Sequence, residues 1–216
     1  EKFEIIRPGD AILDVGCHPG GWTQVSVEEV GDEGLVIGVD IKSTSPIEGA
    51  TVLQGNIIHK ETIERIEELL DGGQFNIVLS DISPKLTGRY DTDQAISLEL
   101  STMTLDVAMD LLAPGGAFVT KIFQGVGIEG LIKAAKDRFS NVQRFAPMAS
   151  RNSSSETYLI CRNRLPVPRR PARGITAFEQ VLSHLTEVGI NVDETSTEDE
   201  EIEIIKGFRR LNRNDE

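Results

Sequence analysis

The chain has 216 residues, 39% of them hydrophobic, and a formal net charge of −13 at pH 7. This length allows one sizeable core with an extension, and the apolar runs are too short to cross a membrane. The negative net charge argues against non-specific electrostatic binding of nucleic acid, since that affinity comes mainly from Lys and Arg contacting phosphates. Cys17 and Cys161 lack metal-ligand spacing, so we expect reduced thiols and no metal site. Without an apparent membrane span or signal peptide, we expect a cytoplasmic location.

The order of apolar segments predicts alternating strands and helices, and hence an α/β sheet with helices on both faces. The expected strands are Ala11–Val15, Leu35–Asp40, Thr51–Gln54, Asn76–Ser80, Ala117–Phe123, Val142–Phe145 and Thr157–Cys161. The clearest helices are Trp22–Val30, Glu61–Leu70, Ile96–Leu112 and Gly127–Phe139. Only a loop separates the last two strands, which predicts an antiparallel hairpin at one edge of an otherwise parallel sheet.

A glycine-rich turn follows the first strand, in the stretch from Leu13 to Trp22. The spacing of Gly16, Gly20 and Gly21 is G-x-x-x-G-G, which differs from the G-x-G-x-x-G of dinucleotide-binding folds. With Asp14 as an acceptor and the exposed backbone N–H groups of the turn, this stretch suits the ammonium and carboxylate of S-adenosylmethionine. A plain tight connection is the alternative.

Two further polar residues end the next strands. Asp40 comes roughly 20 residues after the glycine turn, where a carboxylate can accept hydrogen bonds from both ribose hydroxyls of a nucleoside. Asn56 follows the third strand, where it could contact an adenine or simply hold a turn. Asp40 could likewise only cap its strand.

Three ionisable residues are expected at the carboxyl edge of the sheet. Asp81 follows the fourth strand, Lys121 lies near the end of the apolar fifth strand, and Glu156 precedes the last strand. Open α/β sheets bind ligands at that edge, so these side chains should lie beside the cofactor. A structural salt bridge between Asp81 and Lys121 is the alternative.

Several motifs together resemble the FtsJ/RrmJ family of RNA ribose 2′-O-methyltransferases. They are Asp14-Val-Gly-Cys-His-Pro-Gly-Gly-Trp22, Ser80-Asp-Ile-Ser-Pro84, Leu112-Ala-Pro-Gly-Gly116, Val119-Thr-Lys-Ile-Phe-Gln-Gly125 and Ser150-Arg with Ser155-Glu-Thr-Tyr158. The resemblance covers nearly all of residues 1–162, in order. It implies a class I methyltransferase fold, Rossmann-like with a seven-stranded, mostly parallel sheet. It also implies methyl transfer from S-adenosylmethionine to a ribose 2′-hydroxyl, typically of a uridine in large-subunit rRNA within the ribosomal subunit.

The resemblance also implies roles for individual residues. The family's lysine–aspartate–lysine–glutamate tetrad places its aspartate on Asp81, its second lysine on Lys121 and its glutamate on Glu156. The cofactor positions that the resemblance implies are Gly20, Trp22, Asp40, Asn56 and Asp81. Asn56 stands where the family commonly has aspartate.

The first lysine of the tetrad has no counterpart here, because Lys2 lies too close to the first strand. The chain also begins at Glu1 rather than a methionine. We therefore expect that native upstream residues, including an RNA-docking segment, are missing.

The expected base for the 2′-hydroxyl proton is Lys121. A partly buried site next to the sulfonium and a second lysine would favour its neutral amine, whereas Asp81 and Glu156 would oppose this and orient Lys121 and the ribose. Local positive charge would hold the RNA, through Lys85, Arg89 and Arg151 on loops at the same edge.

The composition changes after Arg164, which predicts a methyltransferase domain over 1–164, a Pro/Arg linker over 165–174 and a helical, acidic extension over 175–216. Arg169, Arg170 and Arg173 in the linker could add phosphate contacts. Thr176 and Glu179 have the spacing of a capping box. The helix that follows carries an apolar stripe, which we expect to dock on the parent domain: Phe178, Val181, Leu182, Leu185 and Val188.

Competing interpretations remain open at this point. They are a tRNA 2′-O-methyltransferase, a small-molecule methyltransferase on the same fold, and a non-catalytic domain that binds S-adenosylmethionine or RNA. The glycine spacing and Trp22 disfavour a dehydrogenase.

Overall fold

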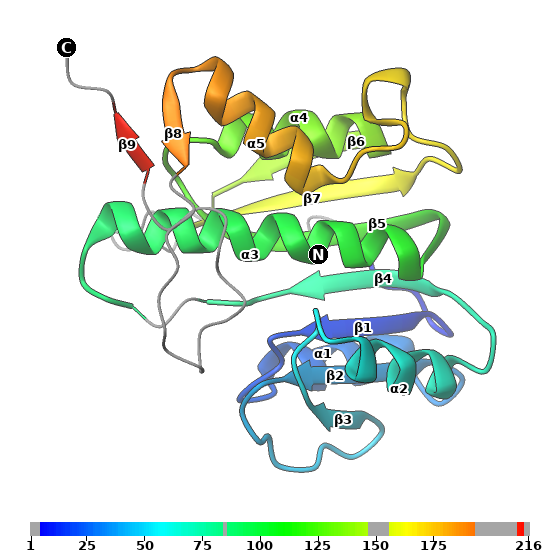
Figure 1. Ribbon diagram of the computed structural model, residues 1–216. Coiled ribbons are helices and arrows are strands. Elements are labelled where there is room, and N and C mark those ends of the chain that lie inside the picture. The colour runs from blue at the N-terminus through cyan, green and yellow to red at the C-terminus, as the bar shows by residue number, and fades with distance from the viewer. Residues whose placement is uncertain (1–4, 84–85, 147–155, 193–210, 214–216) are drawn as a thin grey trace.

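The fold is built on a seven-stranded sheet with the strand order β3-β2-β1-β4-β5-β7-β6 (Figure 1). A computed structural model describes residues 5–83, 86–146, 156–192 and 211–213 of the chain. The strands of this sheet are β1 Ala11–Val15, β2 Leu35–Asp40, β3 Thr51–Gln54, β4 Phe75–Ser80, β5 Leu112–Phe123, β6 Phe139–Phe145 and β7 Glu156–Arg164. Strands β1 to β5 pair in parallel, while β7 runs antiparallel to both β5 and β6. The predicted mostly parallel sheet with an antiparallel hairpin at its edge is confirmed.

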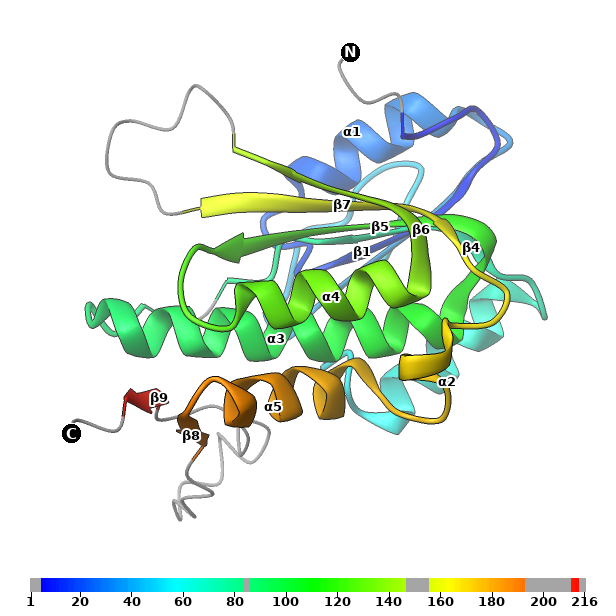
Figure 2. The same cartoon turned by 90° about the horizontal axis from the view of Figure 1, so that it is seen from above.

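The helices that connect these strands cover both faces of the sheet, as predicted. They are α1 Gly21–Val30, α2 Lys60–Leu70, α3 Tyr90–Leu111 and α4 Ile128–Arg138. In Figure 2, α1 lies on one side of the sheet and α3 and α4 lie on the other. Correspondingly, Val30 packs with Ile12 and Ile77 in one cluster, whereas Leu98 and Leu131 belong to a larger cluster on the opposite face.

The main difference from the predicted elements is the start of α3. Apolar periodicity placed it at Ile96, but the helix begins at Tyr90. The carboxylate of Asp93 accepts hydrogen bonds from the backbone N–H and the hydroxyl of Thr87 and from the backbone N–H of Gly88. An acidic residue in the first turn also complements the helix dipole, so a polar segment extends the helix beyond its apolar face.

The Pro/Arg composition of segment 165–174 predicted a freely extended linker, and this prediction is wrong. The backbone of this segment is tied to the end of α4, because Leu165 N–H donates to Arg138 O at 2.8 Å and Arg169 N–H donates to Asp137 O at 2.8 Å. The short helix η1 (Arg170–Ala172) follows, with Ala172 buried. Proline in the first turn of η1 pre-sets the helical φ. This explains why the segment forms a helical turn rather than the extended linker that was expected.

The C-terminal helix α5 (Ala177–Glu187) packs on α3 and α4, so the expected docking on the parent domain is confirmed. Thr176 and Glu179 form the predicted capping box, and Asp106 of α3 accepts hydrogen bonds from two backbone N–H groups in the first turn of α5. Val188 was wrongly placed in the buried stripe, because the helix ends one residue earlier and Val188 is 53% exposed. Beyond α5, β8 (Ile190–Val192) and β9 (Leu211–Arg213) form an antiparallel pair.

No helix in the described part of the chain is both long and apolar enough to cross a bilayer.

Candidate active site at the carboxyl edge of the sheet

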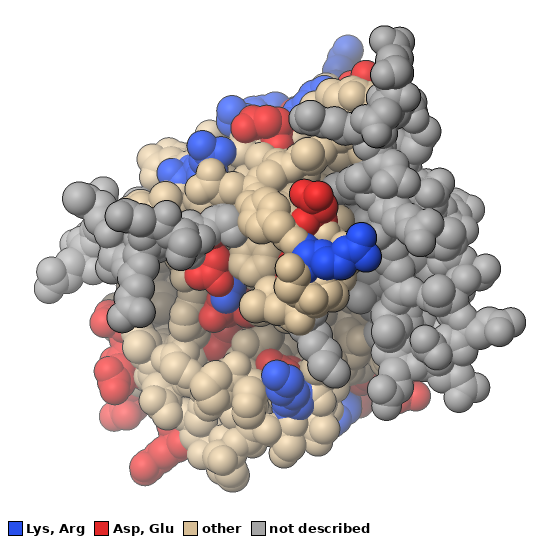
Figure 3. All heavy atoms as spheres, turned by 90° about the vertical axis from the view of Figure 1, so that its left-hand side faces the viewer, with Lys and Arg blue, Asp and Glu red and all other residues tan. Residues whose placement is uncertain are grey.

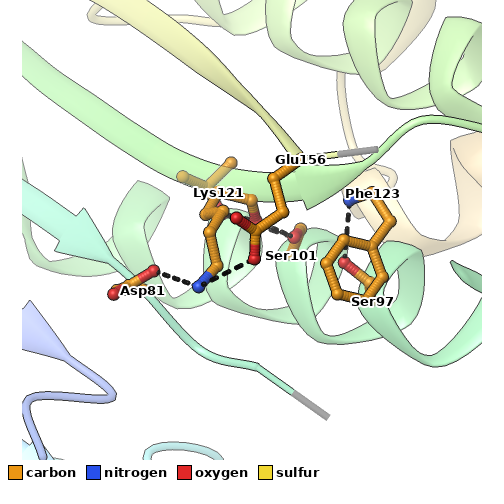
Figure 4. A network of polar contacts seen from close by, with 7 residues as sticks. Asp81, Ser97, Ser101, Lys121, Phe123 and Glu156 are labelled. Atoms are coloured by element: carbon orange, nitrogen blue, oxygen red, sulfur yellow. Dashed lines mark hydrogen bonds and ion pairs between the residues drawn. The ribbon is translucent and has the colours of Figure 1, made fainter. Parts of the chain in front are cut away.

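Lys121 lies between two carboxylates at the carboxyl edge of the sheet (Figure 4). Its ammonium Nζ is 2.7 Å from Oδ1 of Asp81 and 3.7 Å from Oε1 of Glu156. Strand pairing explains the arrangement: β5 lies beside β4, whose end carries Asp81, and Phe123 of β5 pairs with Glu156 at the start of β7. The sheet therefore brings together the three residues that the sequence predicted as catalytic.

The two carboxylates decide the protonation of Lys121. Burial disfavours its charged form, because only 13% of the side chain is exposed. The hydrogen bond that Lys121 donates to Asp81, together with the negative charges of Asp81 and Glu156, more than offsets burial, so the pKa of Lys121 lies above its ordinary value. Asp81 and Glu156 therefore oppose the neutral amine, as expected from the sequence.

Helix α3 holds the strand that carries Lys121. Ser101 donates its hydroxyl proton to the backbone carbonyl of Lys121 at 3.1 Å, and Ser97 accepts from the backbone N–H of Phe123 at 3.2 Å (Figure 4). These two serines point from α3 toward the end of β5. The sequence alone does not indicate them, because serines in an apolar helix carry no signal of their own until the partner strand is known.

The glycine turn packs closely against the loop that carries Asp81. Gly16 has φ +79°, and a Cβ there would come within 2.9 Å of the backbone nitrogen of Ile82. Gly20 has φ +120°, and a Cβ there would meet the side chain of Ile47 at 2.7 Å. Gly16 is required for conformation and for space, because its neighbour is backbone, whereas Gly20 is required mainly for its positive φ. The turn then opens α1 at Gly21.

Asp14 is fully buried below this turn. Its Oδ2 accepts a hydrogen bond from the hydroxyl of Thr23 at 2.6 Å, whereas Oδ1 has no hydrogen-bond partner among the described residues. Burial raises the pKa of Asp14 to about 6, with the charges of Asp81 and Asp40 acting in the same direction. A buried carboxylate oxygen without a partner is costly, so a cationic group beside the turn would supply what it lacks.

Asp40 and Asn56 both make local hydrogen bonds. The two carboxylate oxygens of Asp40 accept from the backbone N–H groups of His18 and Lys42, at 3.0 and 2.8 Å. This fixes the glycine turn relative to β2 and leaves each oxygen capacity for a further donor. The side-chain oxygen of Asn56 accepts from Ile58 N–H at 3.3 Å, which is the turn-holding role that the sequence left open.

Trp22 and Tyr158 stack at this edge. Their ring centroids are 5.9 Å apart, with 30° between the ring planes, and they join the start of α1 to β7. The sequence singled out Trp22 but assigned no role to Tyr158. Burial and the charge of Asp81 raise the pKa of the Tyr158 phenol, which places this ring within the same electrostatic environment as Lys121.

Of the three residues predicted to bind RNA, the structure describes one. Arg89 is exposed just before α3, while Lys85 and Arg151 lie outside the described residues. Figure 3 shows the face at this edge of the sheet, where basic side chains gather along the upper rim and acidic ones along the lower left. Within the described part of the chain, no cluster of His, Cys, Asp or Glu could hold a metal ion.

Solved structures share the fold. A Plasmodium falciparum protein assigned as a ribosomal RNA methyltransferase superposes with a TM-score of 0.70 at 28% identity, over 76% of this chain and 91% of its own. A fibrillarin/Nop5p complex shares the fold alone, with a TM-score of 0.52 at 13% identity, over 73% of this chain and 74% of its own. The strand order with its reversed β7, and the glycine turn beside it, thus define a class I methyltransferase fold.

The comparison of sequences identifies the family within this class of methyltransferases. The family model described as FtsJ-like methyltransferase matches residues 1–164, and the chain belongs to this family. Curated relatives named ribosomal RNA large subunit methyltransferase E include one from Methanothrix thermoacetophila, 44% identical over 79% of this chain and 66% of its own length. Another, from Chromobacterium violaceum, is 38% identical over 76% of this chain and 80% of its own. The chain thus spans about two thirds of the first of these relatives.

Proposed function

We propose that this protein transfers a methyl group from S-adenosylmethionine to a ribose 2′-hydroxyl of large-subunit ribosomal RNA. In its most specific form, the proposal is that the target is a uridine and that the substrate is the rRNA within the ribosomal subunit. The observation that supports it best is Lys121 between Asp81 and Glu156, at the sheet edge that also carries the glycine turn. Relatives 38–44% identical are named for the large-subunit RNA substrate. A cytoplasmic location, and a catalytic domain over 1–164 extended by 165–216, are parts of this proposal.

The residues around the glycine turn fit the cofactor. The unpartnered Oδ1 of Asp14 suits its ammonium, and the backbone N–H groups at the start of α1, where the glycine turn ends, suit its carboxylate. Asp40, with spare acceptor capacity on each oxygen, would hold the ribose hydroxyls, and Asn56 and Trp22 would border the rest of the ligand. When bound, the cofactor supplies a methyl group on a positively charged sulfonium.

Lys121 would accept the proton of the attacking 2′-hydroxyl. A 2′-hydroxyl is a weak acid, so methyl transfer needs in-line alignment and a group that takes its proton. Because its pKa is raised in the free protein, Lys121 must first lose its own proton, and a nearby sulfonium charge would favour that loss. Asp81 and Glu156 would orient the amine and the ribose.

A methyl-transfer assay tests the proposal. Labelled S-adenosylmethionine is incubated with the full-length protein and with unmodified large-subunit rRNA, free and within subunits, alongside tRNA. We expect label on a ribose 2′-oxygen of the rRNA, and expect Lys121→Ala to abolish it while cofactor affinity stays nearly unchanged. Lys60→Ala is the matched control, since the Lys60 side chain is 87% exposed on α2. Label on tRNA instead of rRNA would identify the protein as a tRNA 2′-O-methyltransferase. Cofactor binding without any label would refute catalysis.

A further inference from the structure

The charge of this chain is distributed very unevenly. Residues 128–175 contain ten of the 22 Lys and Arg residues but only three of the 35 Asp and Glu residues. This stretch therefore carries a net charge of +7, and the rest of the chain carries −20. The described part of this stretch forms α4, β6, β7 and η1, and β6 and β7 lie at the opposite edge of the sheet from β3 (Figure 1).

Not all of these cations are available to a partner. Arg138 is 2% exposed and donates to the carbonyl of Ile175 and to Gln180. Arg164 donates to the Met109 carbonyl at 2.6 Å, and Arg169 donates to the Lys136 carbonyl. Arg138 and Arg169 thereby stabilise the junction between α4, α5 and the linker, and Arg164 joins β7 to α3.

Five other cations are exposed, and we name them the basic edge: Lys133, Lys136, Arg144, Arg170 and Arg173. Arg144 lies 4.0 Å from Glu129, a loose and exposed pair. Among the described residues, no carboxylate lies within ion-pair distance of the other four. Lys133 and Lys136 are three residues apart on α4, so they share one side of that helix. Arg173 donates from Nε to the carbonyl of Pro168 at 3.1 Å and remains exposed. A strongly acidic protein thus keeps a row of exposed cations on one side, of which only Arg144 has an ion-pair partner among the described residues.

The basic edge starts next to the active site. Arg144 pairs with Leu159 in the β6–β7 ladder, one position from the pair of Phe145 with Tyr158, and Tyr158 itself pairs with Lys121. From there α4 leads away from the carboxyl edge for about 16 Å, at 1.5 Å per residue, to the linker with Arg170 and Arg173. In Figure 3, basic side chains gather along the upper rim of the face that carries the active site.

We propose that the basic edge binds the sugar-phosphate backbone of RNA outside the target nucleotide, as a second contact surface beside the active site. This inference rests on the proposed function for the identity of the RNA. Exposed Lys and Arg side chains in a row contact phosphates without reading bases, so they position the RNA rather than specify its sequence. The surrounding acidic surface would repel RNA elsewhere and so restrict binding to this side.

The test compares two triple variants with the same change in net charge. Lys133→Gln, Lys136→Gln and Arg170→Gln remove three cations of the basic edge, whereas Arg7→Gln, Lys60→Gln and Arg65→Gln remove three exposed cations from the acidic part of the chain. Binding of large-subunit rRNA fragments is measured between 50 and 200 mM salt. We expect the first variant to bind at least tenfold more weakly, with a salt slope shallower by about two to three units. The second variant should match the wild type.

Two results would overturn the inference: equal weakening in both variants, which would indicate net charge alone, or unchanged RNA binding in the first. Cofactor affinity, which should be unchanged, controls for folding. In the methyl-transfer assay, the first variant should raise KM for long RNA and leave kcat and turnover of a short oligonucleotide unchanged. If the wild type transfers no methyl group but the two variants still differ in RNA binding, the proposed function fails and the basic edge survives.

Discussion

Replacing Asp14 by asparagine should stabilise the cofactor-free protein, and by an amount that depends on pH. In the folded protein the pKa of Asp14 is raised from 3.8 to about 6, mainly by burial. Protonated Asp14 is therefore favoured by folding, and the wild type loses stability as the pH rises through this interval. Each unit of pKa difference corresponds to about 1.4 kcal/mol, so above pH 6 the buried charge of Asp14 lowers the free energy of unfolding by about 3 kcal/mol.

Asparagine removes this charge but keeps an oxygen that can accept from Thr23. We expect Asp14→Asn to match the wild type in free energy of unfolding near pH 4 and to exceed it by up to about 3 kcal/mol at pH 8. Urea denaturation of both proteins at the two pH values measures this difference. Thr23→Val, which removes the hydroxyl donor but leaves the buried charge, is the control and should destabilise most at pH 8.

A difference that does not change between pH 4 and pH 8 would refute the argument, because it would mean that Asp14 is not a buried charge in the folded state. The same substitution should weaken binding of S-adenosylmethionine, since the charge that destabilises the free protein would pair with the cofactor ammonium. Isothermal titration at pH 8 tests this second part.

Two further predictions concern Lys121 and α5. Because the pKa of Lys121 is raised, methyl transfer should increase with pH across the neutral range, and Asp81→Asn should move the pH profile of the residual activity to lower pH by removing the main stabilising charge; an unmoved profile would exclude Lys121 as the base. Leu185 is fully buried against the loop at Gly127, so Leu185→Ala should cost about 3 kcal/mol of unfolding free energy in urea. Val188→Ala, at a position 53% exposed, should change little, and an equal loss in both would contradict the docking of α5.

The sequence predicted the fold well because its elements have strong local signals. Short apolar runs located each strand of the sheet, although β5 begins at Leu112 rather than Ala117. The single loop between the last two strands predicted the hairpin. The start of α3 was missed because hydrogen bonds of Asp93, rather than apolar periodicity, begin that helix. The linker was misjudged because proline and arginine suit both an extended segment and a turn packed on a helix.

The site was predicted in part, and for a clear reason. Asp81 and Lys121 end neighbouring strands, so topology alone brings them to one edge, and Glu156 follows from the antiparallel pairing of β7. Protonation was beyond the sequence, because the balance between burial and two carboxylates depends on distances of 2.7 and 3.7 Å. Ser97, Ser101 and Tyr158 were missed for the same reason, since their contacts exist only once α3 and β7 are packed.

The stacking of Trp22 on Tyr158 has a practical consequence. Trp22 is the single tryptophan of the chain, so all indole emission comes from the junction between the glycine turn and β7. Intrinsic fluorescence therefore reports on this edge of the sheet without any label. Ligand entry, movement of β7 relative to α1 and loss of the fold would each change the surroundings of one known ring.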